Sequence, residues 1–171
     1  MKERIEFKVN SKTALKALTD LIVVSFLFIP ASLIFVFILP SLLSFLAVIL
    51  AYSLLYFIPV LYLHSNYENE NKGKILILRA GELSYDGQNI AERDIKEINA
   101  FGTGASFNLD HYSRLAHMSG YFYVEIKTNN NQNIYLTSLL SHQLIYYVEV
   151  SFPKTKINKL KKFYPTLKKG D

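Results

Sequence analysis

The feature that most constrains this chain is a run of forty-three residues without an acidic or basic side chain. Residues 21–63 contain no Asp, Glu, Lys, Arg or His, and Leu39-Pro40-Ser41 interrupts them near the middle. One helical membrane crossing needs about 20 apolar residues. The run is therefore too long for one crossing and long enough for two. It predicts a hairpin of two transmembrane helices within residues 11–64, with its turn near 39–41.

Both halves of this run are apolar on every side. Residues 21–39 contain fifteen Leu, Ile, Val or Phe residues, and residues 42–63 contain fourteen. At about −0.3 to −0.6 kcal/mol for each such residue, both halves favour insertion. A cleaved signal peptide does not fit, because its apolar region spans only about 7–15 residues. A buried hairpin of a soluble protein does not fit either, because neither half has a polar face.

Small and hydroxyl-bearing residues recur along both predicted helices. Small side chains let two helices approach closely in a membrane, although a serine also commonly bonds to its own helix backbone. Residues 21–63 contain no charge, so a pump or a proton relay has no candidate residue. The residues expected to contribute to helix packing are Ser25, Ser32, Ser44, Ala47 and Ala51.

The distribution of basic residues predicts the orientation of the hairpin. Five basic residues precede it, Lys72, Lys74 and Arg79 follow it, and the turn between the helices carries no charge. Cytoplasmic flanks of membrane helices are enriched in Lys and Arg. We therefore expect both termini in the cytoplasm. The absence of cysteine fits a reducing compartment and excludes disulfides and thiolate sites.

Beyond a polar stretch at residues 65–73, which we expect to be a linker, the pattern becomes that of short β-strands. Asp86-Gly87 is a strong signal for a tight hairpin turn, and residues 102–119 are expected to form a long loop. Closely spaced short strands are typical of an antiparallel barrel or sandwich. The predicted strands are residues 74–79, 82–85, 88–92, 95–101, 121–127 and 133–139.

The two ends of the chain are harder to assign. Residues 142–152 fit either a helix or a strand. Residues 156–163 place Ile157, Leu160 and Phe163 at helical spacing, which predicts a C-terminal helix that plugs the open end of the barrel. Within the arm at residues 1–10, Ile5, Phe7 and Val9 alternate with polar residues, which favours a strand that returns to the soluble sheet over a flexible or interfacial arm.

This order of elements resembles the YcxB-like bacterial membrane proteins, whose soluble part resembles a pleckstrin-homology (PH) domain. The resemblance implies a transmembrane helical hairpin plus a mainly-β cytoplasmic domain, a PH-like barrel with a C-terminal helix, over residues 74–171. It also implies a location in the bacterial inner membrane and no enzyme activity. The residues that carry it are Arg4–Val9, Leu21–Leu63, the segment KILILRAGELSYDGQNIAERDIKEI at 74–98, and Tyr135-Leu136-Thr137-Ser138.

Signals for chemistry are weak throughout. Asp110, His111 and His117 share one loop, but the spacing H-x₅-H matches no common zinc pattern. Gly102-x-Gly104 is half of a dinucleotide fingerprint and opens no helix inside a βαβ unit. We therefore expect no catalytic residue, no cofactor, no metal ion and no small-molecule substrate.

A PH-like fold raises the question of phosphoinositide binding, which requires a basic loop between the first two strands. The predicted loop is Ala80-Gly81, with only Arg79 beside it, which argues against that site. The chain beyond Pro153 is much more basic. Its lysines fit either a solvated helix face or a surface for anionic lipid: Lys154, Lys156, Lys159, Lys161, Lys162, Lys168 and Lys169.

Two functions remain for a chain of this kind. The first is a scaffold, or an accessory or regulatory subunit of a membrane complex, which acts through a protein partner or through self-association. The second is a membrane-sensing module that binds anionic lipid through the basic tail. Nucleic acid is disfavoured as a partner, because residues 64–152 carry seven basic and ten acidic side chains.

Overall fold

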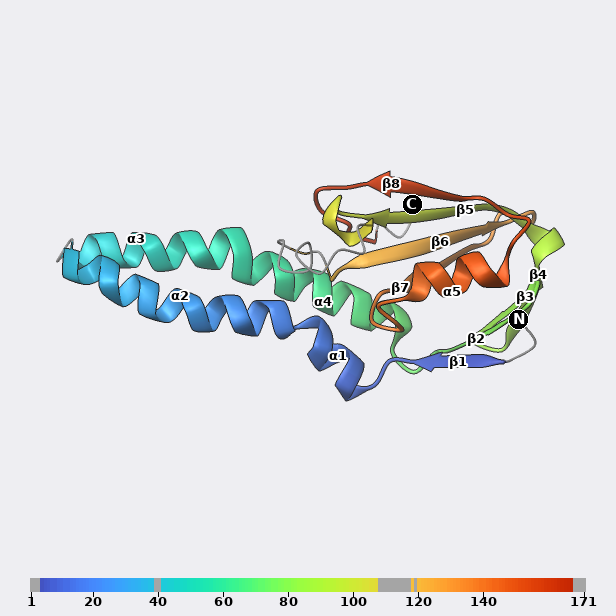
Figure 1. Cartoon of the computed structure of the whole chain (residues 1–171), viewed down its shortest axis with the longest axis horizontal. Coiled ribbons are helices and arrows are strands. Elements are labelled where there is room, and N and C mark those ends of the chain that lie inside the picture. The colour runs from blue at the N-terminus through green and yellow to red at the C-terminus, as the bar shows by residue number, and fades with distance from the viewer. Residues whose placement is uncertain (1–3, 39–40, 108–117, 119, 168–171) are drawn as a thin grey trace.

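The computed structural model describes residues 4–38, 41–107, 118 and 120–167. Its most visible feature is a helical hairpin that projects from one end of a β-rich domain (Figure 1). The first helical part is α1 (Ser11–Ala17) followed by α2 (Thr19–Ile38). The return part is one continuous helix, Leu42–Asn71, made of α3 (Leu42–Tyr52), a π-helical segment η1 (Ser53–Phe57) and α4 (Ile58–Asn71).

The π-helical segment lies directly before Pro59, and proline chemistry explains it. Proline has no N–H to donate, and its ring crowds the carbonyl of the residue four positions earlier, here Leu55. A wider turn relieves that crowding without ending the helix. The helix therefore continues through Pro59 and carries the chain into the β-domain.

The linker expected at residues 65–73 is wrong, because α4 continues to Asn71. Its polar composition suggested a loop, but one face of this stretch is buried, with Tyr67 and Asn71 fully enclosed. The helix ends where Lys72 becomes extended and Gly73 takes a positive φ of 77°. Glycine adopts that conformation without steric cost.

Sheet A is antiparallel, in the order β1-β2-β3-β4. Its strands are β1 (Ile5–Lys8), β2 (Ile75–Arg79), β3 (Glu82–Tyr85) and β4 (Gln88–Ala91). Phe7 of β1 lies opposite Leu76 of β2, so the N-terminal arm joins the soluble sheet across the entire hairpin. Asp86 and Gly87 both have positive φ, the conformation of a type I′ hairpin turn, as their sequence predicted.

Sheet B has the order β7-β6-β5-β8, and β8 runs parallel to β5. The turns η2 (Glu92–Asp94) and η3 (Ala105–Phe107) flank β5. Helix α5 (Leu144–Ser151) connects β7 to β8, which resolves the ambiguity at residues 142–152 in favour of a helix. The strands of this sheet are β5 (Ile95–Gly102), β6 (Phe122–Thr128), β7 (Asn133–Thr137) and β8 (Ile157–Lys161).

The C-terminal helix predicted at residues 156–163 is wrong, because this segment forms β8. Its apolar residues are spaced three apart over one short stretch, which did not distinguish a helix from a strand. The uncovered side of β5 offers backbone hydrogen-bonding groups, and β8 pairs with them from Ile157 to Lys161. Backbone pairing with a distant strand thus overrides a short local pattern.

The main core lies between the two sheets, and α5 lies in the space between them (Figure 1). Leu144 and Val148 of α5 are fully buried there. The helix that fills the barrel is therefore α5, and the chain continues beyond it to β8. The other buried residues of this core come from both sheets and include Leu76, Leu78, Leu83, Ile98, Val124, Ile126 and Leu136.

Candidate interaction site at the hairpin junction

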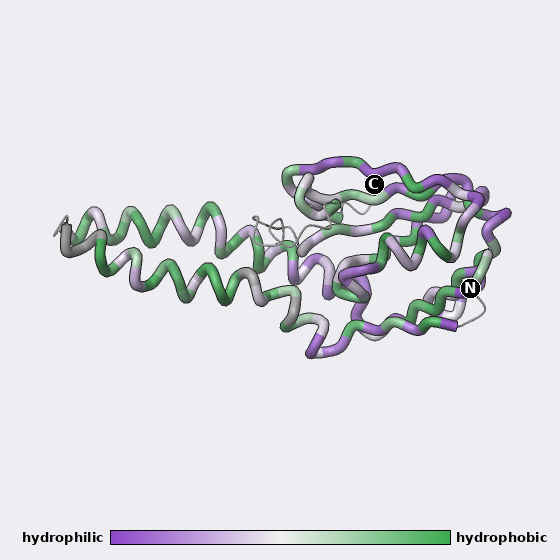
Figure 2. The backbone as a smooth tube through the Cα atoms, in the orientation of Figure 1, coloured by the Kyte–Doolittle hydropathy of each residue, from purple (hydrophilic) through white to green (hydrophobic). Residues whose placement is uncertain are grey.

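Large apolar side chains are exposed along most of the hairpin. By length and composition, the helix Leu42–Asn71 can cross a membrane, and only 11% of its most apolar window is buried. The helix Leu21–Ile34 is apolar but shorter. Figure 2 shows both helices as continuous bands of hydrophobic residues outside the β-domain. The most exposed of these side chains are Phe26, Leu27, Leu42, Leu43 and Leu55.

The exposed band ends where the helices meet the domain. Leu21 on α2 and Val60 and Leu63 on α4 are buried in a second apolar cluster, together with Tyr67 and Leu139. The part of the return helix without a buried side chain, which we call its bare part, therefore runs from Leu42 to Ile58, and within it Tyr56 packs at the edge of the second cluster. This is shorter than the hairpin predicted to residue 64, because the β-domain covers one face of the last helical turns.

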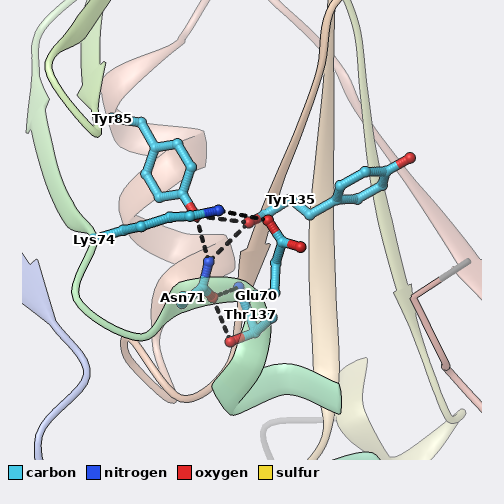
Figure 3. A network of polar contacts seen from close by, with 6 residues as sticks. All are labelled: Glu70, Asn71, Lys74, Tyr85, Tyr135 and Thr137. Atoms are coloured by element: carbon cyan, nitrogen blue, oxygen red, sulfur yellow. Dashed lines mark hydrogen bonds and ion pairs between the residues drawn. The ribbon is translucent and has the colours of Figure 1, made fainter. Parts of the chain in front are cut away.

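Asn71 fixes the end of α4 to both sheets (Figure 3). Its side-chain amide donates hydrogen bonds to the Tyr85 hydroxyl of β3, at 2.6 Å, and to the Tyr135 carbonyl of β7, at 3.0 Å. Its side-chain carbonyl accepts from the backbone N–H of Thr137, at 2.8 Å, and from the Thr137 hydroxyl. A buried amide with all of these partners is strongly positioned.

An ion pair lies beside this amide. The Lys74 ammonium is 2.9 Å from a Glu70 carboxylate oxygen and 5.4 Å from the centre of the Tyr85 ring. Partial burial acts to lower the pKa of Lys74, but the hydrogen bond and charge of Glu70 outweigh it, so this pKa is raised. Burial raises the pKa of Tyr85.

Glu70, Lys74 and Tyr85 line a small polar cavity of about 180 Å³, together with Asp86, Gln88 and Gln132. The charges of Lys74 and Glu70 compensate each other, and Asp86 adds one carboxylate to the lining. The cavity is best understood as part of the joint between α4 and the sheets.

Aromatic side chains dock α4 on the face of sheet B that points away from the main core. The Tyr67 ring meets Tyr121 edge-on at 5.6 Å and Tyr123 at 6.3 Å between ring centres. Tyr123 in turn stacks on Phe101 at 4.8 Å. Burial, with a contribution from Glu125, raises the pKa of Tyr123 to about 12.

The segment after β8 runs back along α4. The Tyr164 hydroxyl donates to the Pro59 carbonyl at 2.6 Å, and the Tyr67 hydroxyl donates to the Pro165 carbonyl at 2.7 Å. The Leu167 N–H donates to the Asn66 side-chain oxygen at 3.0 Å. The segment Tyr164–Leu167 is thereby held beside α4.

The structure distributes the lysines of the tail over different surroundings. Lys162 lies 4.1 Å from the centre of the Phe101 ring and donates to the Tyr123 hydroxyl at 2.9 Å, so it has a packing role. Lys159 pairs with Glu149 at 3.1 Å. That the tail lysines contact lipid stays a prediction. Lys154, Lys156 and Lys161 are exposed, and Lys168 and Lys169 lie outside the described residues.

The predicted helix-packing residues are placed differently from one another. Ser25 donates to the Leu21 carbonyl at 2.7 Å and also bonds the Tyr52 hydroxyl of the other helix. Ser32 bonds its own helix, Ser44 is half-buried, and Ala47 and Ala51 are exposed.

Aromatic stacking makes part of the contact between the two helices. Phe28 stacks on Tyr52 at 4.1 Å between ring centres. Sequence reasoning missed this pair, although a tyrosine in an apolar run was an available signal.

Two loops were considered as binding sites from the sequence, Ala80-Gly81 for phosphoinositides and residues 102–119 for a metal ion. The first two strands of sheet A are β1 and β2, so the segment that connects them is the helical hairpin. The loop Ala80-Gly81 connects β2 to β3, so the prediction that it joins the first two strands is wrong. The weak metal candidates Asp110, His111 and His117 lie outside the described residues.

Comparison with known proteins agrees with this architecture. A family model described as PH domain matches residues 6–145, from β1 into α5, and so includes the strand before the hairpin and strands β2 to β7 after it, while β8 lies beyond the match. Neither the curated proteins nor the solved structures contain a match to this chain. The domain predicted at 74–171 thus also includes β1. The chain belongs to the PH-domain family, with a helical hairpin between the first two strands of its sheet.

Proposed function

We propose that this protein is a non-catalytic membrane protein that presents its PH domain at the cytoplasmic face of a bacterial inner membrane. A PH domain is a module for interaction with lipids or proteins. The proposed role is a scaffold, or an accessory or regulatory subunit of a membrane complex. Its resemblance to YcxB-like proteins belongs to the same proposal.

One observation carries this proposal: the helix that leaves the exposed hairpin ends inside the domain. It runs without a break from Leu42 to Asn71, and Asn71 is fully buried against both sheets. A flexible tether would let the domain sample many orientations. A helix fixed by buried hydrogen bonds instead holds the PH domain in one orientation against the membrane surface.

The length of the bare hairpin supports the membrane location. Leu42–Ile58 contains seventeen residues, which at about 1.5 Å per residue gives a rise of roughly 25 Å. A bilayer core is about 30 Å thick, and slight local thinning accommodates a shorter span. The exposed side chains of such a helix would otherwise present a large apolar patch to water.

We propose that a protein partner binds the free sheet edges. Among the described strands, β4 pairs only with β3 and β8 pairs only with β5. An edge strand has unpaired backbone groups that can add a strand from another chain. The long loop at residues 102–119, of which 108–117 and 119 lie outside the described residues, is the second proposed contact surface.

The experiment tests membrane association and partner binding together. The tagged full-length chain should stay in membranes through an alkaline carbonate wash and should be crosslinked in native membranes to a partner or to itself. In a two-residue hairpin, the residue pair next to the turn, here Tyr85 and Gln88, exchanges backbone hydrogen bonds between the strands. The backbone N–H of the next residue, Asn89, therefore points away from β3, toward the free edge of the sheet. Asn89→Pro removes this N–H without removing a hydrogen bond between β3 and β4. Asn89→Ala is the matched control.

We expect the crosslinked species to be lost in Asn89→Pro and kept in Asn89→Ala, with equal membrane yield. A chain that washes off membranes with carbonate contradicts the membrane location. A chain that stays in membranes but is recovered only as a monomer contradicts the scaffold role.

The alternative function is a module that senses anionic lipid through its lysines. The observation that favours it is the placement of the basic end, which Tyr164 ties to α4 at Pro59. In this role, replacing the seven tail lysines by Gln lowers the affinity of the domain surface for anionic lipid and flattens its salt dependence.

A further inference from the structure

Phe163 is the most exposed large apolar side chain outside the hairpin among the described residues, at 87%. A single exposed phenylalanine is common in soluble proteins and indicates little by itself. The meaning of this one depends on where the chain holds it and on which side chains surround it.

The contacts on either side of Phe163 fix its position. Before it, the Lys162 N–H donates to the Gly102 carbonyl at 2.8 Å. After it, Tyr164 donates to the Pro59 carbonyl, one residue beyond the bare part of the return helix. Figure 1 shows the turn that follows β8 at the end of the domain that faces the hairpin. Phe163 is therefore held close to the level at which the exposed apolar band begins.

The surroundings of Phe163 have the composition of a membrane interface. Lys161 is exposed and makes no ion pair with any described residue. Leu160 is 42% exposed, and Tyr62 on α4 is 59% exposed. Aromatic side chains concentrate at the level of lipid headgroups, and lysines beside them keep their charge at the surface while their stems cover apolar area.

We propose that the turn Lys161–Tyr164 is a second membrane contact, separate from the hairpin. Phe163 inserts among the lipid headgroups, and Lys161 binds the phosphates of anionic phospholipids. The turn thereby sets the orientation of the PH domain on the bilayer. This inference rests on the proposed membrane location, and it places lipid contact in one turn of chain rather than in the seven lysines together.

A bilayer fits this turn better than a protein partner does, because the turn is continuous with the exposed apolar band. The turn after β8 lies at the end of the domain that faces the hairpin, which is where the proposed membrane location puts the bilayer surface. A partner that covered Phe163 would have to lie between the domain and the membrane surface.

The chain contains no tryptophan, which makes a direct test possible. Phe163→Trp places a single tryptophan, whose emission can be excited selectively, at the turn. Phe26→Trp places one in the exposed band of α2, and Tyr146→Trp places one on α5 as a control remote from the hairpin. Each full-length variant is reconstituted into nanodiscs of phosphatidylcholine, with and without phosphatidylglycerol, that contain lipids brominated either near the headgroup or deep in the acyl chain.

We expect Phe163→Trp to emit at shorter wavelength in nanodiscs than in detergent and to be quenched by shallow bromine more than by deep bromine. Adding Lys161→Gln to this variant, or omitting phosphatidylglycerol, should reduce the quenching. Phe26→Trp should be quenched most by deep bromine, and Tyr146→Trp by neither.

The failures of the two proposals are distinguishable. If Phe26→Trp is quenched and Phe163→Trp is not, the second contact is overturned and the membrane location stands. If neither is quenched, both are overturned. Quenching of Phe163→Trp that is the same with and without phosphatidylglycerol overturns the role given to Lys161.

Discussion

At the scale of single residues, Asn71 does most to define how the hairpin meets the domain. It contacts β3 and β7 at once, through residues that lie 14 and 66 positions later in the chain. The sequence around it, a run of Asn and Glu, gave no sign that this asparagine differs from Asn66 or Asn69. Its partners are distant in sequence, so only the folded structure identifies it.

Replacing Asn71 by Asp tests this role. The change keeps the size of the side chain, but it removes both N–H donors and places a carboxylate beside the Tyr135 carbonyl. Each buried group left without a partner costs about 1–3 kcal/mol, and more when it is charged. We expect a clear fall in the urea midpoint of the purified protein in detergent, and no comparable fall for the exposed Asn69→Asp. Equal stability of the two variants contradicts the account.

Tyr123 predicts a dependence of stability on alkaline pH. Its pKa is about 12 in the folded chain and about 10 in an unfolded one. The unfolded state therefore releases its proton first, and the stabilisation present below pH of about 10 is lost as pH rises toward 12. We expect Tyr123→Phe to lessen the fall of the unfolding free energy over this range, measured by urea titration at each pH. Tyr146→Phe, at an exposed position, should leave the slope unchanged.

At the scale of elements, the sequence predicted best what is decided locally. Strands β2 to β7 lie close to their predicted positions because alternation and turn residues such as Asp86-Gly87 are short-range signals. The predictions failed where contacts with residues far along the chain determine the secondary structure. Residues 65–71 became helical through burial against the sheets, and residues 157–161 became a strand by pairing with β5.

Helix α5 lies between the two sheets, and its buried side chains should contribute strongly to stability. Leu144 is fully buried, whereas Val150 on the same helix is 36% exposed. We expect Leu144→Ala to lower the unfolding free energy by about 2–5 kcal/mol and Val150→Ala by less than about 0.5 kcal/mol. Chemical denaturation followed by tyrosine fluorescence measures both. Similar losses for the two variants would contradict this packing.

At the scale of the whole molecule, the PH domain is built from two separated parts of the chain. Residues 5–8 supply the first strand, and residues 75–161 supply the others, with the hairpin between them. The apolar composition of residues 21–63 predicted the hairpin, and alternation with turn residues predicted the β-domain. The candidate site at their junction was only partly predictable, because its tyrosines and Asn71 come together through the fold.

This arrangement predicts that the domain needs its first strand. In a soluble variant, residues 4–10 are joined by a Gly/Ser linker to residues 58–171, so that β1 can still pair with β2. We expect it to remain soluble and to give dispersed amide signals in NMR spectra. Residues 58–171 alone should aggregate, because the edge of β2 is bare and Phe7 no longer packs on Tyr147. Equal behaviour of the two would show that β1 is dispensable.

The measurement that tests the central claim most directly is the accessibility of single cysteines in sealed right-side-out membrane vesicles. The natural chain has no cysteine, so Ser41→Cys reports the turn of the hairpin and Asn130→Cys reports the exposed turn between β6 and β7. We predict that a membrane-impermeant maleimide labels Ser41→Cys in sealed vesicles and labels Asn130→Cys only after the vesicles are opened. Labelling of both positions in sealed vesicles would place the turn and the PH domain on the same side, which contradicts the account.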